Sequence, residues 1–252
     1  MRWILLTSII FLGFFLILGK NLSTNERALM PAIAPAPTPQ PSKIIDLVYK
    51  GVTYRVNIIE VAETETTTLF LNLKEKLTLS QAKEKQSCRA VVNGGFYNKS
   101  DTPIGFFRVN GETIQPATKN SLFNGYITII NNSFSISGNL IESDSGLQSG
   151  PLLIVDQTVL PLRIREDEHA RRMVAAKTAA AGLVFLSLYD PASTFAGPLL
   201  ADLPDVLRAW SNQTGTTITD AINLDGGSAS GMISDSVNLG ELTHAGSFFC
   251  IK

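Results

Sequence analysis

The feature that most constrains the fold of this chain is a cluster of prolines near its N-terminus. Five of the twelve prolines in the 252 residues lie between positions 31 and 41, alternating mainly with alanine and threonine. Proline fixes φ and lacks a backbone N–H, so such a run builds neither helix nor sheet and favours extended polyproline geometry. Residues 20–42 are therefore predicted to be a semi-rigid linker or stalk. One folded domain is expected over residues 43–252, which is long enough to bury a substantial core.

An apolar segment precedes this linker. Residues 3–19 carry no charge and are flanked by Arg2 and Lys20. The run of about 17 residues is short for a full membrane span and long for the core of a signal peptide. No good cleavage site follows it closely, which favours an uncleaved signal anchor with Arg2 in the cytoplasm. Residues 1–19 are thus expected to form an apolar helix that anchors the protein facing the periplasm or exterior. A cleaved signal peptide and a secreted protein are the alternative.

Charge and composition exclude several classes of protein. Lys and Arg number 21 and Asp and Glu number 22, so neither a generally basic nucleic-acid binder nor an acidic disordered chain is expected. Two cysteines and two histidines exclude a disulfide-dense scaffold and make a histidine-rich metal centre improbable. Cys88 and Cys250 either pair on the far side of a membrane or remain two buried thiols. No cofactor is expected, although Asp225 with neighbouring carbonyl groups leaves calcium open.

The domain is predicted to be α+β, a single mixed-sheet domain with few helices. Thr78 is expected to cap a helix that ends at Gln86, with Gln81 completing a capping box. A second helix is expected over residues 198–212, or starting just after Leu203 because of Pro204. Strands are predicted at 44–49, 52–61, 69–73, 89–92, 106–109, 112–114, 126–130, 133–137, 152–155, 183–189 and 221–224.

Two segments share one pattern, in which a short apolar strand is followed by a polar residue and a glycine pair. They are Asn93, Gly94, Gly95, Phe96, Tyr97 and Asn223, Leu224, Asp225, Gly226, Gly227, Ser228. Paired glycines let a backbone approach a ligand and present amide groups to it. Ordinary turns are the alternative. Asp225 is the only carboxylate embedded in a glycine-rich strand end, so it is the first candidate for an acid, base or nucleophile.

Two further segments are candidates for binding. His169 precedes Arg171 and Arg172, and guanidinium groups bind phosphate through paired hydrogen bonds. The alternative is a solvated charge cluster, because residues 166–168 are all acidic, and a structural histidine. Ser149 and Gly150 precede a buried strand and could simply form a turn. Their sequence does not fit a Gly-x-Ser-x-Gly elbow, which disfavours a hydrolase of that design.

In their order along the chain, these motifs resemble the phosphodiester glycosidase family, which contains the uncovering-enzyme-like domain. Its bacterial members are often labelled exopolysaccharide biosynthesis proteins. The motifs are residues 93–97, Pro103-Ile104-Gly105 with Asn110-Gly111, Ser149-Gly150-Pro151, Arg171-Arg172 and residues 223–228. The resemblance covers about residues 44–252. It implies hydrolysis of a sugar attached through its anomeric carbon to a phosphodiester, on an envelope or extracellular glycoconjugate.

The resemblance also implies roles for individual residues. The implied catalytic residues are Asp225, Arg171, Arg172, Asn93 and Asn223, and Gly94, Gly95, Gly226 and Gly227 fall on the family's glycine positions. With these four glycines, the candidate substrate-binding residues are Phe96, Tyr97, Ser149, Gly150, Ser228 and His169. An arginine and glycine amides would stabilise the departing phosphate. Asp225 would activate water or stabilise positive charge at the anomeric carbon, and the two asparagines would orient sugar hydroxyls. The family usually has a small residue after the arginine, so Arg171 and Arg172 compete for one role.

The sequence therefore predicts that three distant stretches converge on one electropositive, amide-lined hollow with a lone acid at its edge. The expected partner is a glycoconjugate or sugar-phosphate, with membrane contact through residues 1–19 and no nucleic acid. A competing interpretation is a non-catalytic polysaccharide-binding module of the envelope that takes part in exopolysaccharide assembly. Anchor and linker would place either protein at the cell envelope.

Overall fold

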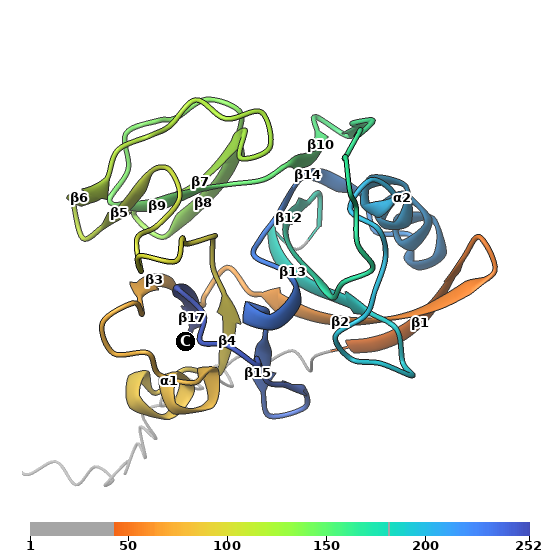
Figure 1. The fold of residues 1–252 in the computed structure, drawn as a ribbon, viewed down its shortest axis with the longest axis horizontal. Helices are drawn as coiled ribbons and strands as arrows, with labels where there is room; N and C mark the ends of the chain where they lie inside the picture. The colour runs from red at the N-terminus through yellow and green to blue at the C-terminus, as the bar shows by residue number, and fades with distance from the viewer. Residues whose placement is uncertain (1–42, 181) are drawn as a thin grey trace, which may run out of the picture. The chain divides into compact units, whose positions relative to one another are not determined.

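The computed structural model describes residues 43–180 and 182–252 (Figure 1). The predicted anchor over 1–19 and the linker over 20–42 lie outside the described residues, so both stay predictions. Within the described part, every helix is too short or too polar to cross a bilayer. The predicted α+β class with few helices is confirmed, because the described residues contain two α-helices and many strands. The strands do not form one sheet but are divided among three.

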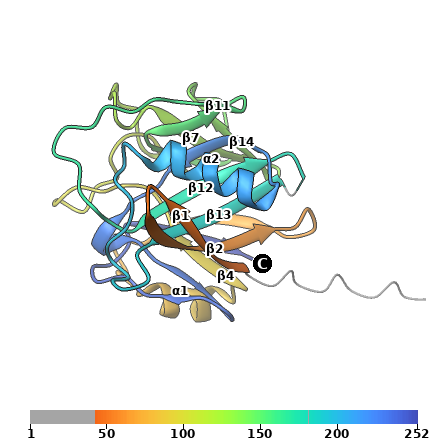
Figure 2. The ribbon, with the colours of Figure 1, turned by 90° about the vertical axis from the view of Figure 1, so that its right-hand side faces the viewer.

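The largest sheet has seven strands and carries one helix on its face. In spatial order the strands are β1 (Lys43–Tyr49), β2 (Val52–Val61), β13 (Gly182–Tyr189), β12 (Arg172–Thr178), β14 (Ile218–Asn223), β10 (Leu152–Val155) and β11 (Thr158–Val159). Neighbouring strands pair antiparallel. Helix α2 (Leu203–Thr214) lies across this sheet (Figure 2). Its buried face, including Val206, Leu207 and Trp210, packs on Val174 and Leu186 of the sheet.

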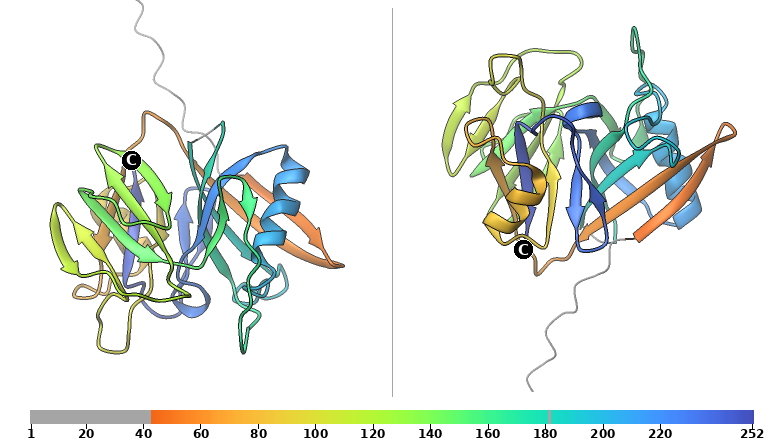
Figure 3. Two further views of the ribbon diagram at one scale, coloured as in Figure 1. Left: turned by 90° about the horizontal axis from the view of Figure 1, so that it is seen from above. Right: turned by 60° about the horizontal axis from the view of Figure 1, so that its bottom comes forward.

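Two smaller sheets complete the domain. The first contains β16 (Asn238–Leu239), β15 (Met232–Ser234), β4 (Ala90–Asn93), β17 (Ser247–Ile251) and β3 (Thr67–Leu71). The second contains β6 (Glu112–Gln115), β5 (Phe107–Val109), β9 (Ser145–Ser149), β7 (Gly125–Ile130) and β8 (Ser133–Ser137). Helix α1 (Leu79–Gln86) packs beside β4 and β17, and a short 3-10 turn, η1 (Gly227–Ala229), follows β14. Figure 3 shows the green strands β7 to β9 and helix α2 on opposite sides of the domain.

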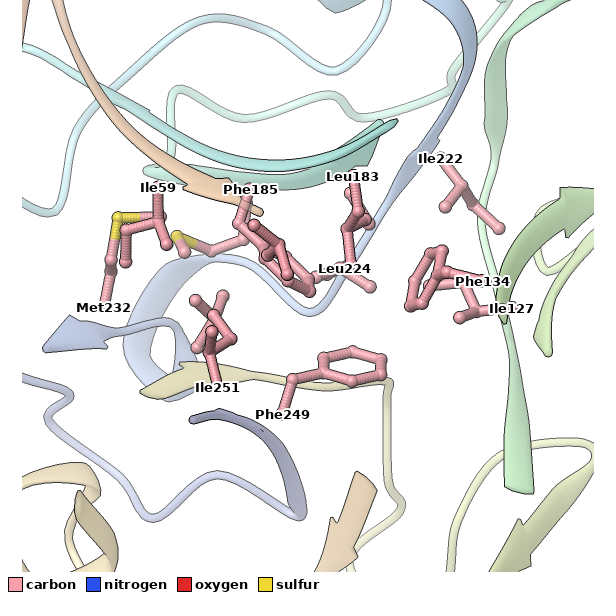
Figure 4. Packing of buried hydrophobic residues seen from close by; sticks show 14 of the residues in the cluster. Ile59, Ile127, Phe134, Leu183, Phe185, Ile222, Leu224, Met232, Phe249 and Ile251 are labelled. Atoms are coloured by element: carbon pink, nitrogen blue, oxygen red, sulfur yellow. The ribbon is translucent and has the colours of Figure 1, made fainter. Parts of the chain in front are cut away.

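One apolar core joins all three sheets. Phe185 comes from the seven-stranded sheet, Phe249 from β17 and Phe134 from β8, and their side chains point toward a common centre (Figure 4). The ring centroids of Phe185 and Phe249 are 5.3 Å apart, and that of Phe134 is 6.2 and 6.0 Å from them. Aromatic groups at these separations combine a large buried area with favourable ring geometry. This core fixes the sheets against each other and so fixes the strand ends that they present.

Most predicted elements are present, with shifted ends. Helix α2 begins at Leu203, next to the later of its two predicted starts, with Pro204 in its first turn. Proline fits there because the first turn of a helix needs no N–H donor. The predictions missed six of the described strands, namely β9, β11, β12, β15, β16 and β17. Strand β12 is the important omission, because it begins at Arg172.

The predicted capping box at α1 is confirmed. Thr78 Oγ1 accepts a hydrogen bond from Gln81 N at 3.2 Å, and Gln81 Oε1 accepts one from Thr78 N at 2.9 Å. We expect Thr78→Ala to lower the free energy of unfolding by about 1 kcal/mol, since it leaves a helix N–H without its partner. Urea denaturation followed by circular dichroism measures this. Glu84→Ala on the same helix is the matched control and should change stability less than Thr78→Ala does.

The structure also resolves the alternatives for the two cysteines. Cys88 and Cys250 form a disulfide, with Cα atoms 5.5 Å apart and 162 positions between them in sequence. The bond links the short connection between α1 and β4 to the last described strand, β17. It therefore ties the connection that leads into β4, the strand that ends at Asn93, to the neighbouring strand of the same sheet.

Candidate active site

The two glycine-rich strand ends lie side by side. Strand β4 ends at Asn93, and Asp225 lies two residues beyond the end of β14. Asn93 Nδ2 donates to the backbone oxygen of Asp225 at 2.8 Å, and Asp225 N donates to Gly94 O at 3.1 Å. Asn93 Oδ1 also accepts from Gly231 N at 3.0 Å. Motifs 132 positions apart are thus joined by direct hydrogen bonds.

The arginine pair reaches the same place. Gly227 N donates to Arg171 O at 3.0 Å. A Cβ atom added at Gly226 would lie 2.9 Å from Arg171 O, so this approach requires glycine. The same position lies 3.8 Å from Nη1 of Arg172. The three stretches that the sequence predicted to converge are therefore adjacent in the structure.

A cavity of about 300 Å³ opens at this junction. Five of its lining residues were singled out from the sequence, namely Phe96, Arg172, Asp225, Gly226 and Gly227. Another wall is the irregular segment 161–170, which contributes Ile164 and three acidic residues. A second cavity of about 420 Å³ lies beside the C-terminal end of α2, but no carboxylate lines it. The candidate active site is the cavity that Asp225 lines, because it also contains Arg172 and the glycine pair 226–227.

Asp225 has the electrostatic properties of a proton carrier. Its side chain is partly buried and lines the cavity. Burial raises the pKa of this carboxyl group to about 7, and a hydrogen bond from the backbone of Gly226 offsets only part of that effect. A carboxyl group with such a pKa exchanges protons readily near neutral pH. Strongly shifted groups in cavities are candidates for catalysis.

Arg171 does not line the cavity. Its side chain is 1% exposed, and its Nε donates to Ser230 Oγ at 2.8 Å. Its Nη2 donates to the backbone oxygens of Ser230 and Gly240. The guanidinium lies 4.3 Å from the centre of the Phe195 ring. Burial lowers the pKa of Arg171 to about 10, so it stays charged at neutral pH. Its contacts brace the segment after η1 rather than a substrate.

Arg172 is the arginine that lines the cavity. It is 9% exposed, and its Nε donates to Pro198 O at 2.9 Å. Its Nη2 donates to Glu168 O and to Asp167 Oδ1, the latter at 3.3 Å. Nη1 takes part in none of these bonds. It is the guanidinium nitrogen closest to the Cβ position of Gly226. Burial lowers the pKa of Arg172, and the charge of Asp167 opposes that shift.

The two asparagines differ from the expectation that they orient sugar hydroxyls. Asn93 and Asn223 are 0% and 2% exposed, and neither lines the cavity. Asn223 Nδ2 donates to Gly150 O at 3.0 Å, and Ser149 Oγ donates to Asn223 O at 2.7 Å. All four contacts described for the asparagine amides are to backbone groups. These residues, with Ser149 and Gly150, therefore hold the strand ends in place beneath the cavity.

Several glycines and flanking residues also have structural contacts. A Cβ at Gly94 would lie 2.3 Å from Ser247 Oγ, and one at Gly95 would lie 3.2 Å from Leu147. His169 is exposed, does not line the cavity and has Nδ1 2.9 Å from Gly197 O. Ser228 is exposed, and its hydroxyl accepts from Thr243 Oγ1 at 3.2 Å.

Tyr97 is close enough to Asp225 to be affected by its charge. Its hydroxyl donates to His244 O at 2.7 Å. Burial raises the pKa of Tyr97, and the charge of Asp225 adds to that effect. The tyrosine is thus within electrostatic range of the carboxyl group, although it is not part of the cavity wall described above.

The charge of the cavity differs from the predicted electropositive hollow with a lone acid. Four carboxylates, those of Glu166, Asp167, Glu168 and Asp225, line it together with one arginine. The amide of Gly227 is bonded to Arg171 O and that of Gly226 to the Asp225 carboxyl group, so the hollow is not lined by free amides from this glycine pair. Sequence reasoning missed the acidic residues because a run of charge is equally typical of a solvated surface.

Asp167 explains how Arg172 is held. Its Oδ1 accepts from Leu200 N at 3.0 Å and its Oδ2 from Ala201 N at 2.8 Å, in addition to the contact with Arg172.

Among the described residues, no three side chains of His, Cys, Asp or Glu are placed to hold a metal ion. The expectation that no cofactor is needed stays a prediction.

Comparison with known proteins identifies the family of this chain. A sequence model described as phosphodiester glycosidase matches residues 86–246. A search of curated proteins finds no match. A solved structure of a hypothetical protein from Synechocystis is 13% identical, with a TM-score of 0.58 over 83% of this chain. This chain covers 61% of that protein's length.

The catalytic domain of zebrafish N-acetylglucosamine-1-phosphodiester alpha-N-acetylglucosaminidase, auto-inhibited by its pro-peptide, is also similar. It is 13% identical, with a TM-score of 0.58, and the match covers 84% of this chain and 82% of that domain. At such low identity these likenesses show a shared fold. The family assignment rests on the sequence model, which spans most of the chain and contains the motifs at 93–97, 149–151, 171–172 and 223–228. The resemblance seen in the sequence is confirmed, and the chain belongs to the phosphodiester glycosidase family.

Proposed function

We propose that this protein hydrolyses a sugar linked through its anomeric carbon to a phosphodiester, on an envelope or extracellular glycoconjugate. The observation that carries the proposal is the shared cavity of Asp225 and Arg172, in which burial raises the pKa of the acid to about 7. Membership of a glycosidase family supports hydrolysis as the reaction class. The name of the zebrafish neighbour supports a glycosyl phosphodiester as the substrate class.

In the proposed reaction, the ionised carboxylate of Asp225 accepts a proton from water. The water oxygen forms a bond to the anomeric carbon, and the bond from that carbon to the phosphate oxygen breaks. The electron pair of the broken bond leaves with the phosphate, which departs as a monoester. Nη1 of Arg172 is the donor best placed to stabilise this charge, because its other nitrogens are held by Asp167, Glu168 and Pro198. A strong general acid is not required, since phosphate is a good leaving group.

The pH dependence tests the role of Asp225. As a general base it must be ionised, so kcat/KM should rise about tenfold per pH unit below pH 7 and flatten above it. The measurement is release of a chromogenic alcohol phosphate from an activated sugar phosphodiester between pH 4.5 and 9. A rate that instead falls as pH rises through 7 would assign Asp225 as a general acid.

The same assay separates the enzyme from the alternative, a polysaccharide-binding module of the envelope. Release that depends on Asp225 supports the enzyme. Tight binding of a glycan with no release from any sugar phosphodiester would support the binding module.

We further propose that the folded domain faces an oxidising compartment, either the periplasm or the exterior. The disulfide between Cys88 and Cys250 supports this, because disulfides persist in such compartments and are rare in the cytosol. Alkylation of free thiols in intact cells, followed by mass spectrometry of the protein, tests the proposal. Labelling of both cysteines without prior reduction would contradict it.

A further inference from the structure

The acidic wall of the cavity carries charge that the proposed hydrolysis does not use. Glu166 and Glu168 both line the cavity, and both residues are exposed to solvent. Within residues 43–180 and 182–252, neither carboxylate lies within 4 Å of a cationic group. Arg163 and Arg165 are on the same segment and are exposed, but they are not part of the lining. Two residues of the lining therefore carry carboxylates outside ion-pair distance of any described cation, although the charge of Glu168 acts on Arg172 and opposes burial, which lowers the pKa of that arginine.

The positive charge of the cavity is already balanced. Arg172 is the one cationic residue of the described lining, and its guanidinium is paired with Asp167. It is nine-tenths buried, and Nη1 is the nitrogen left for a ligand. Arg172 and Asp167 together carry no net charge, so the carboxylates of Glu166 and Glu168 give the cavity a net negative charge. A simple phosphodiester anion would gain one hydrogen bond from Nη1 but would be repelled by these two carboxylates.

From this charge arrangement we infer that the cavity binds a zwitterion, in which an ammonium group accompanies the phosphate. This inference rests on the proposed function and adds a substrate class to it. The phosphate would contact Nη1 of Arg172, and the ammonium group would lie near Glu166 and Glu168. An ammonium group fits better than a bound metal ion, because no three acidic, histidine or cysteine side chains of the described residues are placed to hold a metal.

The ammonium group has two possible positions in a sugar phosphodiester. It is either a free amine on the sugar or an amine on the alcohol beyond the phosphate, as in an ethanolamine ester. Both present the same pair of charges to the cavity. The experiment therefore needs one pair of probes for each position, and each pair compares a free amine with its N-acetylated form.

The first pair is glucosamine 1-phosphate and N-acetylglucosamine 1-phosphate, and the second is glycerophosphoethanolamine and its N-acetyl form. Affinity is measured by calorimetry at pH 7.5 and low salt, on the full chain carrying Asp225→Asn so that no probe is hydrolysed. Two partly exposed ion pairs should give the amine of at least one pair about threefold to tenfold tighter binding. The preference should shrink at 0.5 M salt, because the carboxylates are accessible to solvent.

Variants identify the residues responsible. Glu166→Gln with Glu168→Gln should remove the preference without weakening the N-acetylated probe. Glu112→Gln with Glu142→Gln is the matched control, since both residues are exposed and lie outside the lining, and it should leave the preference intact. Equal affinity for amine and acetylated forms in both pairs, no binding of any probe, or a preference that survives Glu166→Gln with Glu168→Gln would overturn the inference. So would a preference that EDTA abolishes, because it would indicate a metal ion.

Failure of this inference is distinguishable from failure of the proposed function. Hydrolysis of an activated sugar phosphodiester without any preference for an amine would keep the enzyme and remove the zwitterion. Preferential binding of the amine without hydrolysis would keep the zwitterion and remove the enzyme.

Discussion

Asp225→Asn should lower kcat for a sugar phosphodiester by roughly a hundredfold or more, because an amide cannot accept the proton of the attacking water. The substitution keeps the size of the side chain and the polar contact with Gly226. The backbone contacts of residue 225 with Asn93 and Gly94 do not involve its side chain, so they should persist. A loss of turnover in this variant therefore reports on the carboxylate and not on the loop.

The same substitution should stabilise the fold at high pH. Asp225 has a pKa of about 7 in the folded protein, against an ordinary value of 3.8 for an aspartate in water. Between these values the folded state holds a proton that the unfolded state has released, so stability falls as pH rises through this window. Above pH 7 the cost of ionising this partly buried group is at most about 4 kcal/mol. Asp225→Asn removes that cost, which is absent below pH 4.

Denaturant unfolding at pH 4, 6 and 8 measures the effect as a stability difference that widens with pH. Asp235→Asn is the matched control, because Asp235 is exposed and its hydrogen bond with Lys83 lowers its pKa. The free energy of unfolding of Asp235→Asn, relative to that of the unsubstituted protein, should not increase as the pH rises. Asp225→Ala serves as a second variant, since asparagine followed by glycine can hydrolyse back to aspartate. A folded Asp225→Asn protein with full turnover would remove Asp225 from the mechanism.

The sequence predicts the local features of this fold better than its long-range ones. Hairpins such as that at Asn110-Gly111 and the capping box at Thr78 depend on residues close together in the chain, and both are present. The glycine pairs at 94–95 and 226–227 mark real strand ends. Their close approach depends on the pairing of β4 with β15 and β17, and of β14 with β12 and β10. No local pattern specifies those partners.

The different roles of the two arginines could have been predicted from the sequence. Successive side chains of a strand point to opposite faces. Arg172 begins β12 and Arg171 directly precedes it, so an early assignment of β12 would have separated the two side chains. The buried roles of Asn93 and Asn223 were less accessible. A polar residue before a glycine pair is compatible with a ligand contact or with a backbone brace, and only the surrounding chain decides between them.

Arg172→Met is expected to lower kcat/KM by about a hundredfold to a thousandfold, as loss of a donor aimed at developing charge does. It also leaves Asp167 without its cationic partner, and an unpaired buried carboxylate destabilises a fold. The double variant Arg172→Met with Asp167→Asn controls for this, because it removes both charges. We expect the double variant to recover stability without recovering activity.

Arg171→Met is the matched substitution at the adjacent position. It removes the donors to Ser230 and Gly240 and should lower the free energy of unfolding by about 3 kcal/mol, since those buried groups lose their partners. Activity per folded molecule should fall less than tenfold, because Arg171 does not line the cavity. For all three variants, kcat/KM is measured per folded molecule, and the free energy of unfolding is measured with denaturant. Near-normal kcat/KM in the folded double variant, or an equal loss per folded molecule in Arg171→Met, would show that the cavity does not use Arg172 in this way.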